Sequence, residues 1–198
     1  MNFSEFQVYF QVGYQHIVAW DGLDHILFIV ALCAMYSFSQ WKTVFWLATA
    51  FTLGHSLTLA LAALGWLTFN KQWIEFFIPI TILCTALLNL LEANKPQTTP
   101  YLRYAMATIF GFIHGFAFSQ LLRSMFQQSG QSLVYKLLAF NIGIEVGQIL
   151  VIGFVLAICF IFVRLLQWQQ QRWSFVLSVL TLILAGFILF QKSTELFA

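Results

Sequence analysis

The sequence predicts an all-α polytopic membrane protein with six transmembrane helices in one bundle. Of its 198 residues, 61% are hydrophobic and 8% are charged, whereas about 25% of the residues of a soluble domain are charged. The apolar residues also gather in six stretches, each close to the roughly 20 residues that a spanning helix needs. Because no long polar segment interrupts them, we expect a single transmembrane domain over residues 1–198.

The first predicted span covers about 14–38, and its polar residues are crowded into its first half. Residues 3–13, which precede it, are predicted to form a short helix along the membrane interface. Phe3, Phe6 and Phe10 repeat there at near-helical spacing, as in helices that lie flat on a membrane. The N-terminal region is therefore expected to be an interfacial helix followed by a span.

The remaining spans are separated by polar connections. The segment 95–100 contains two prolines, which end helices, and a polar stretch at 123–132 separates the fourth span from the fifth. The fifth span is longer than the bilayer is thick and is expected to tilt or project. These five spans cover about 43–65, 73–92, 102–122, 134–165 and 174–191.

The basic residues divide almost evenly between the two predicted faces, with five against four. One face holds Lys42, Lys95, Arg103, Arg164 and Arg172, and the other holds Lys71, Arg123, Lys136 and Lys192. Because the more basic face is usually cytoplasmic, both termini are predicted to be on the non-cytoplasmic side. No basic cluster exists, so a nucleic-acid partner is not expected.

All four histidines, His16, His25, His55 and His114, lie inside or at the edge of apolar stretches. An ionisable side chain in hydrocarbon costs about 2.5–3.5 kcal/mol on insertion scales, so its default interpretation is a functional site. The last three fall on different predicted helices, between the middle of the membrane and its N-terminal side. Glu145 lies at a similar depth, roughly 16 Å into the fifth helix at 1.5 Å per residue. These side chains are therefore predicted to share one cavity.

Imidazole together with carboxylate is a ligand set that divalent transition metals such as nickel and zinc prefer. A neighbouring carboxylate can also orient a ligating imidazole through its second nitrogen. A polar network that only joins the helices is the alternative for these residues. The predicted metal ligands are His25, His55, His114, Asp24 and Glu145, and the predicted peripheral residues are His16, Asp21, Asn141 and Gln148.

Four segments of the chain resemble the HupE/UreJ family of bacterial membrane proteins. They are GLDHILF at 22–28, TAFTLGHSLTL at 49–59, FGFIHG at 110–115 and FNIGIEVGQ at 140–148. The family is associated with nickel uptake for hydrogenase and urease, and its Asp-His motif is similar to that of nickel–cobalt permeases. The resemblance therefore implies a permease for nickel or a related divalent metal in the bacterial inner membrane. Ile17 stands where the family pattern has a proline, so His16 is treated as peripheral.

The same residues leave open a zinc-dependent intramembrane hydrolase. Three histidines holding zinc leave a fourth position for an activated water. Asp24 or Glu145 would then be the general base and Ser56 an oxyanion donor, with a membrane lipid or lipid-linked molecule as substrate. This set of residues is similar to that of the ceramidase and adiponectin-receptor group, which also places three histidines, an aspartate and a serine in the bilayer. Whether the protein is an enzyme, which metal it takes and its oligomeric state are left open by the residues.

Overall fold

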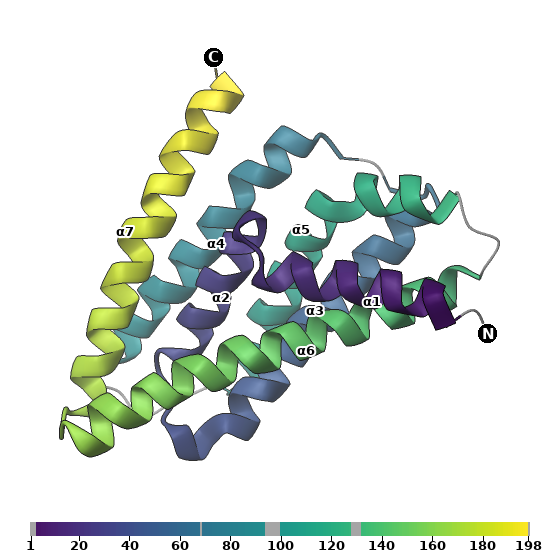
Figure 1. The fold of residues 1–198 in the computed structure, drawn as a ribbon. Helices are drawn as coiled ribbons and strands as arrows, with labels where there is room; N and C mark the ends of the chain where they lie inside the picture. The colour runs from purple at the N-terminus through teal and green to yellow at the C-terminus, as the bar shows by residue number, and fades with distance from the viewer. Residues whose placement is uncertain (1–2, 68, 94–99, 128–131, 198) are drawn as a thin grey trace.

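The computed structural model describes residues 3–67, 69–93, 100–127 and 132–197, and it is all-helical over these ranges (Figure 1). This confirms the predicted all-α class. The α-helices are α1 (Phe3–Val18), α2 (Leu23–Cys33), α3 (Trp41–Ala63), α4 (Lys71–Glu92), α5 (Pro100–Gln127), α6 (Leu133–Phe160) and α7 (Gln170–Phe197). Two short 3-10 turns, η1 (Trp20–Gly22) and η2 (Phe38–Gln40), and one π-helical turn, η3 (Ile161–Leu165), complete the described elements.

Four helical stretches of the described chain are long and apolar enough to cross a membrane, and a bent pair formed by α1 and α2 would make a fifth. They are Phe38–Ala63, Lys71–Glu92, Leu133–Leu165 and Gln170–Phe197. Their outer faces expose large apolar side chains such as Leu53, Phe154 and Ile183, which suits contact with lipid. The chain is therefore a multi-pass membrane protein.

Six complete spans are not found. The predicted span 102–122 lies within α5, which is long but lies outside the set of sufficiently apolar helices. Its glycine, serine, tyrosine and glutamine residues and two arginines dilute its apolar character. Helicity was thus predicted correctly for this segment, but α5 is longer than the predicted span, and its composition does not mark it as a span.

The predicted first span, 14–38, is not one helix. The chain forms α1, breaks at η1 and resumes as α2, and the two helix axes differ in direction by 65°. Gly22 makes this turn feasible, because an added Cβ there would overlap the carbonyl oxygen of His16. The separate interfacial helix predicted for 3–13 is also wrong in its boundary, since α1 continues without interruption to Val18.

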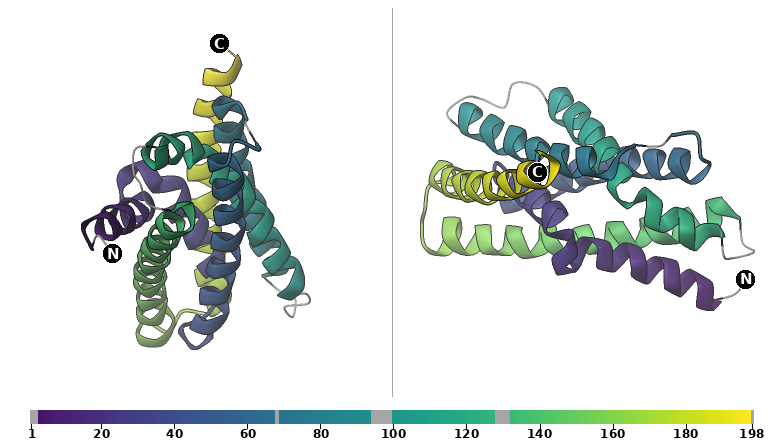
Figure 2. Two further views of the ribbon diagram at one scale, coloured as in Figure 1. Left: turned by 90° about the vertical axis from the view of Figure 1, so that its right-hand side faces the viewer. Right: turned by 90° about the horizontal axis from the view of Figure 1, so that it is seen from above.

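The helices pack mainly in three pairs, α3 with α5, α1 with α6 and α4 with α7. Figures 1 and 2 show α1 lying alongside α6, and α7 alongside α4. Gly54 of α3 and Gly111 of α5 each lie against the other helix's backbone, and Gly13 of α1 and Gly143 of α6 do the same. Small residues allow such close approach between membrane helices. Both glycine-lined crossings adjoin histidines, so they fix the histidine positions.

Gly111→Val is expected to destabilise the protein by about 3 kcal/mol, because added atoms in a well-packed contact must displace backbone. A Cβ at Gly111 would overlap the carbonyl oxygen of Phe51. Thermal unfolding of the purified protein in detergent measures the change. Gly186→Val is the matched control, since nothing lies within 4 Å of a Cβ at Gly186. Equal melting temperatures for the two variants would contradict the proposed crossing.

Candidate metal centre

The four histidines converge on one buried position from four helices. His16 comes from the last turn of α1, His25 from the first turn of α2, His55 from α3 and His114 from α5. The ring centroid of His25 lies 4.4 Å from that of His16, 5.6 Å from that of His55 and 5.1 Å from that of His114. His25, His55 and His114 are each at most 2% exposed. The break between α1 and α2 lets two consecutive helices both contribute.

The tightest group consists of His16, His25 and His55. One ligand nitrogen from each lies within 4.8 Å of the other two. A tetrahedral metal with Zn–N bonds of 2.0–2.1 Å holds its nitrogens roughly 3.4 Å apart. The group therefore needs only small side-chain movements to hold an ion. His16, treated as peripheral from the sequence, lies inside this group, and His114 adjoins it beside His25.

Two hydrogen bonds orient the rings. Nδ1 of His114 donates to the carbonyl oxygen of Phe110 at 2.8 Å, and Nδ1 of His25 lies 2.9 Å from Oδ1 of Asp24. Because a carbonyl or carboxylate oxygen accepts, each Nδ1 carries the proton and each Nε2 keeps a free lone pair. Both rings are thus held with Nε2 ready to bind a cation.

The Nε2 atoms of His16, His25, His55 and His114 are all buried and have no hydrogen-bond partner among the described residues. A buried polar atom left unpaired costs about 1–3 kcal/mol. Four such atoms in one cluster are therefore difficult to explain as structural polar groups. Their free lone pairs are suited to bind a transition metal, and the match between this site and a metal ion depends on these four nitrogen atoms.

Asp24 was predicted as a metal ligand. Its Oδ1 accepts from the His25 backbone N–H at 2.8 Å in addition to contacting the His25 ring. Its side chain is 24% exposed, unlike the buried ring beside it. The structure thus places Asp24 behind His25, where it orients the ring.

Glu145, also predicted as a ligand, lies outside the tight histidine group. Its Oε2 accepts from Oγ1 of Thr49 at 3.3 Å, and Gln148 on the same face of α6 accepts from Thr52 at 3.0 Å. Thr49 precedes His55 on α3 by about 9 Å at 1.5 Å per residue. These two hydrogen bonds join α6 to α3, with Thr49 about 9 Å and Thr52 about 4.5 Å along α3 from His55.

The other predicted residues have mixed placements. Asn141 has a buried Oδ1 with no partner among the described residues, and it follows Phe140, whose ring centroid is 6.0 Å from that of His16. Ser56 donates to the Thr52 carbonyl oxygen at 2.6 Å. That bond occupies the hydroxyl predicted as an oxyanion donor. The side chain of Asp21 lies outside the described residues.

A cavity of about 400 Å³ reaches the histidines from the end of the bundle where α4 begins and α7 ends. His16, Asp24 and His25 line its inner part. Glu75 and Lys192 line its mouth, where Lys192 Nζ is 3.0 Å from Glu75 Oε2. Sequence reasoning missed this mouth, because the two residues are 117 positions apart and no local pattern pairs them. The cavity gives a small cation a route to the cluster.

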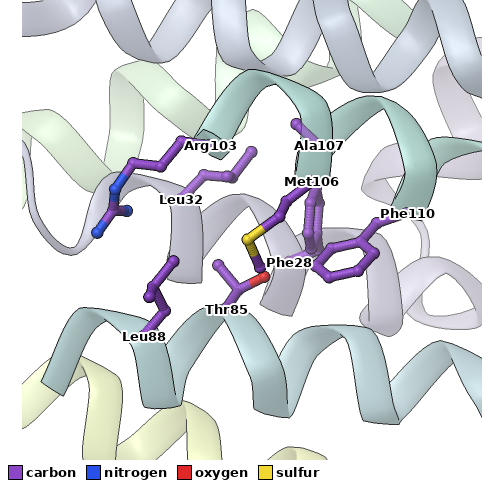
Figure 3. A pocket seen from close by; sticks show the side chains of 8 residues that line it. All are labelled: Phe28, Leu32, Thr85, Leu88, Arg103, Met106, Ala107 and Phe110. Carbon is purple, nitrogen blue, oxygen red and sulfur yellow. The ribbon is translucent and has the colours of Figure 1, made fainter. Parts of the chain in front are cut away.

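The opposite side of the cluster is closed. The ring centroid of Phe28 lies 5.6 Å from that of His114. Phe28 and Phe110 line one end of a void of about 10 Å³, room for one water, and Arg103 lies at its other end (Figure 3). Arg103 is 7% exposed and donates to Glu92 at 2.6 Å and to Asn89 at 2.9 Å. The two sides of the site are therefore unequal, with a wide cavity on one and an aromatic and ion-pair barrier on the other.

Comparison with known proteins gives one match. The family model described as HupE / UreJ protein matches residues 2–192. Neither the curated proteins nor the solved structures gave a match. Because the family model covers nearly the whole length, this histidine-bearing membrane chain belongs to the HupE/UreJ family.

Proposed function

We propose that this protein is a permease for nickel or a related divalent transition metal, and that the ion passes through the four-histidine cluster. The observation that carries the proposal is the set of four buried, unpaired Nε2 atoms at the inner end of an open cavity. Neutral imidazole suits nickel, zinc, copper and iron better than magnesium or calcium, which prefer oxygen ligands. The cluster therefore selects the class of ion.

The charge of the cluster favours transport over permanent retention. Asp24 is the carboxylate at the cluster, and it contacts His25 rather than joining the tight nitrogen group. Glu145, the other predicted carboxylate, pairs with Thr49. A divalent cation in a low-dielectric site with little negative charge is held less firmly than one with several carboxylates. Binding of this kind allows the ion to leave, as transport requires.

Access follows from the unequal sides of the site. The ion enters through the cavity whose mouth carries Glu75 and Lys192, and the barrier of Phe28, Phe110 and Arg103 closes the other side. Release requires this barrier to open. The zinc hydrolase has less support, because the Ser56 hydroxyl donates to the Thr52 carbonyl and Glu145, a predicted general base, accepts from Thr49 outside the tight histidine group.

Uptake of Ni²⁺ into proteoliposomes tests the proposal. The wild-type protein is expected to accelerate uptake over empty liposomes, and His55→Ala is expected to abolish that acceleration. His55 contributes nitrogen atoms that are both buried and unpaired, so its loss removes a ligand without breaking a hydrogen bond of the described structure. Uptake unchanged in His55→Ala would refute the site. Tightly held zinc that survives a chelator, without uptake, would favour the hydrolase instead.

A further inference from the structure

Figure 1 shows the end of the bundle where α6 ends and α7 begins. Two neighbouring cavities lie there, away from the histidine cavity, and one is more polar than the other. The first has a volume of about 130 Å³ and is lined by polar groups that include Arg164 and Gln170. The second is an apolar groove of about 330 Å³. Phe38 lines both, and Leu156 of the groove lies one helical turn from Phe160 of the polar cavity on the same face of α6, so the two cavities are neighbours.

The polar cavity presents one hydrogen-bond donor that lacks an acceptor and one cationic side chain. Nε2 of Gln170 is buried and has no partner among the described residues, whereas Oε1 of the same side chain accepts from the Cys159 thiol at 3.8 Å. Arg164 brings a guanidinium from the π-helical turn η3, a type of turn often found at functional sites. α7 begins at Gln170, and a helix N-terminus favours negative charge. A phosphate group would satisfy these donors together.

The apolar groove follows α6 for about 10 Å, from Ile149 to Leu156 at 1.5 Å per residue. Phe38, Trp41 and Phe45 form one wall, and α6 forms the other from Ile149 to Leu156. Ile149 lies about 16 Å along α6 from Phe160, which lines the polar cavity, at 1.5 Å per residue. One leaflet of a bilayer has a hydrocarbon depth of about 15 Å. The two cavities together therefore have about the extent of one leaflet along α6.

We propose that these two cavities bind one phospholipid, with its phosphate in the polar cavity and one acyl chain in the groove. A soluble phosphate would match the donors of Arg164 and Gln170 but would leave the groove unexplained. The same end of the bundle carries Lys42, Arg103, Arg164 and Arg172, and the sequence prediction assigns Lys95 to this face as well, which makes it the more basic face by five residues to four. The positive-inside rule therefore predicts that this face is cytoplasmic, where anionic phospholipids are abundant.

Two substitutions separate the groove from the headgroup cavity. Gly153 lines the groove, and nothing lies within 4 Å of a Cβ added there, so Gly153→Leu fills the groove without a clash. Gly186→Leu on α7 is its matched control, because a Cβ at Gly186 also meets nothing. Arg164→Gln removes the cation, and its matched control is Arg172→Gln, whose guanidinium lies over the Trp168 ring instead.

Native mass spectrometry of the purified protein in a neutral detergent counts the bound lipids. The probes are phosphatidylglycerol, diacylglycerol with identical acyl chains, and soluble glycerol phosphate. Wild-type protein is expected to retain one phosphatidylglycerol and to prefer it about tenfold over diacylglycerol, as expected for charge-assisted hydrogen bonds. Arg164→Gln should lose most of that preference, and Gly153→Leu should weaken retention of both lipids. The two control variants should behave as wild type.

Three results would overturn the proposal. Equal retention of the two lipids by wild-type protein would show that the phosphate is not recognised. Glycerol phosphate binding as tightly as phosphatidylglycerol would reduce the site to an anion site without a chain. A dimer that Gly153→Leu dissociates, with no lipid retained, would assign the groove to a second copy of the chain.

Discussion

His16→Ala is expected to lower the affinity of the purified protein for Ni²⁺ about 100-fold, whereas Glu145→Gln leaves it nearly unchanged. The loss of one coordinating imidazole is expected to cost roughly 3 kcal/mol of binding free energy, or about 100-fold. A nitrogen of His16 lies within 4.8 Å of those of His25 and His55. Glu145 instead accepts a hydrogen bond from Thr49.

Isothermal titration of Ni²⁺ into the detergent-solubilised protein measures both affinities. The comparison is informative because the sequence alone ranks the two residues in the opposite order, with Glu145 as a ligand and His16 as peripheral. Melting temperatures of the two variants show whether either loses its fold. If Glu145→Gln weakens binding as much as His16→Ala does, the carboxylate enters the site and the assignment made from the structure is wrong.

The convergence of histidines from separate helices could be predicted from the sequence, because polar groups in apolar helices find one another. The position of His16 within the cluster could not be predicted. In the single straight helix predicted over 14–38, His16 and His25 would stand about 14 Å apart along the axis. The 65° bend between α1 and α2 brings their ring centroids to 4.4 Å. The Asp21-Gly22 pair is a turn signal that indicates this break.

For Glu145, the depth in the membrane could be predicted from the sequence, but its partners could not. Its depth in the membrane could be estimated from its position in the predicted span, but depth does not determine which neighbouring helix a residue faces. The rotation of α6 about its own axis decides which helix Glu145 faces. This rotation depends on the crossing of α6 with α1, where Gly143 lies against the backbone of α1, and on the hydrogen bond to Thr49. Both are long-range contacts without a local signature. The helical nature of these segments was accordingly easier to predict than the membership of the site.

Arg103→Met is expected to destabilise the protein by about 3–5 kcal/mol, the usual effect of removing one partner from a buried ion pair. Arg103 joins three helices. It donates from α5 to Glu92 and Asn89 of α4, and Asn89 donates onward to the carbonyl oxygen of Ala31 near the end of α2 at 2.7 Å. Asn89 is 0% exposed, so an unpaired Oδ1 there would have no access to water.

Thermal unfolding of Arg103→Met in detergent measures this effect, and Arg172→Met is the matched control because Arg172 is exposed. In the double variant Arg103→Met, Glu92→Gln, part of the lost stability should return, because no buried carboxylate is left without its cation.

The same network closes the site on the side away from the cavity. Arg103→Met that remains folded should therefore also leak Ni²⁺ across liposomes faster than wild type. If Arg103→Met unfolds at the same temperature as wild type and leaks no more Ni²⁺, then this ion pair neither holds the three helices together nor closes the site.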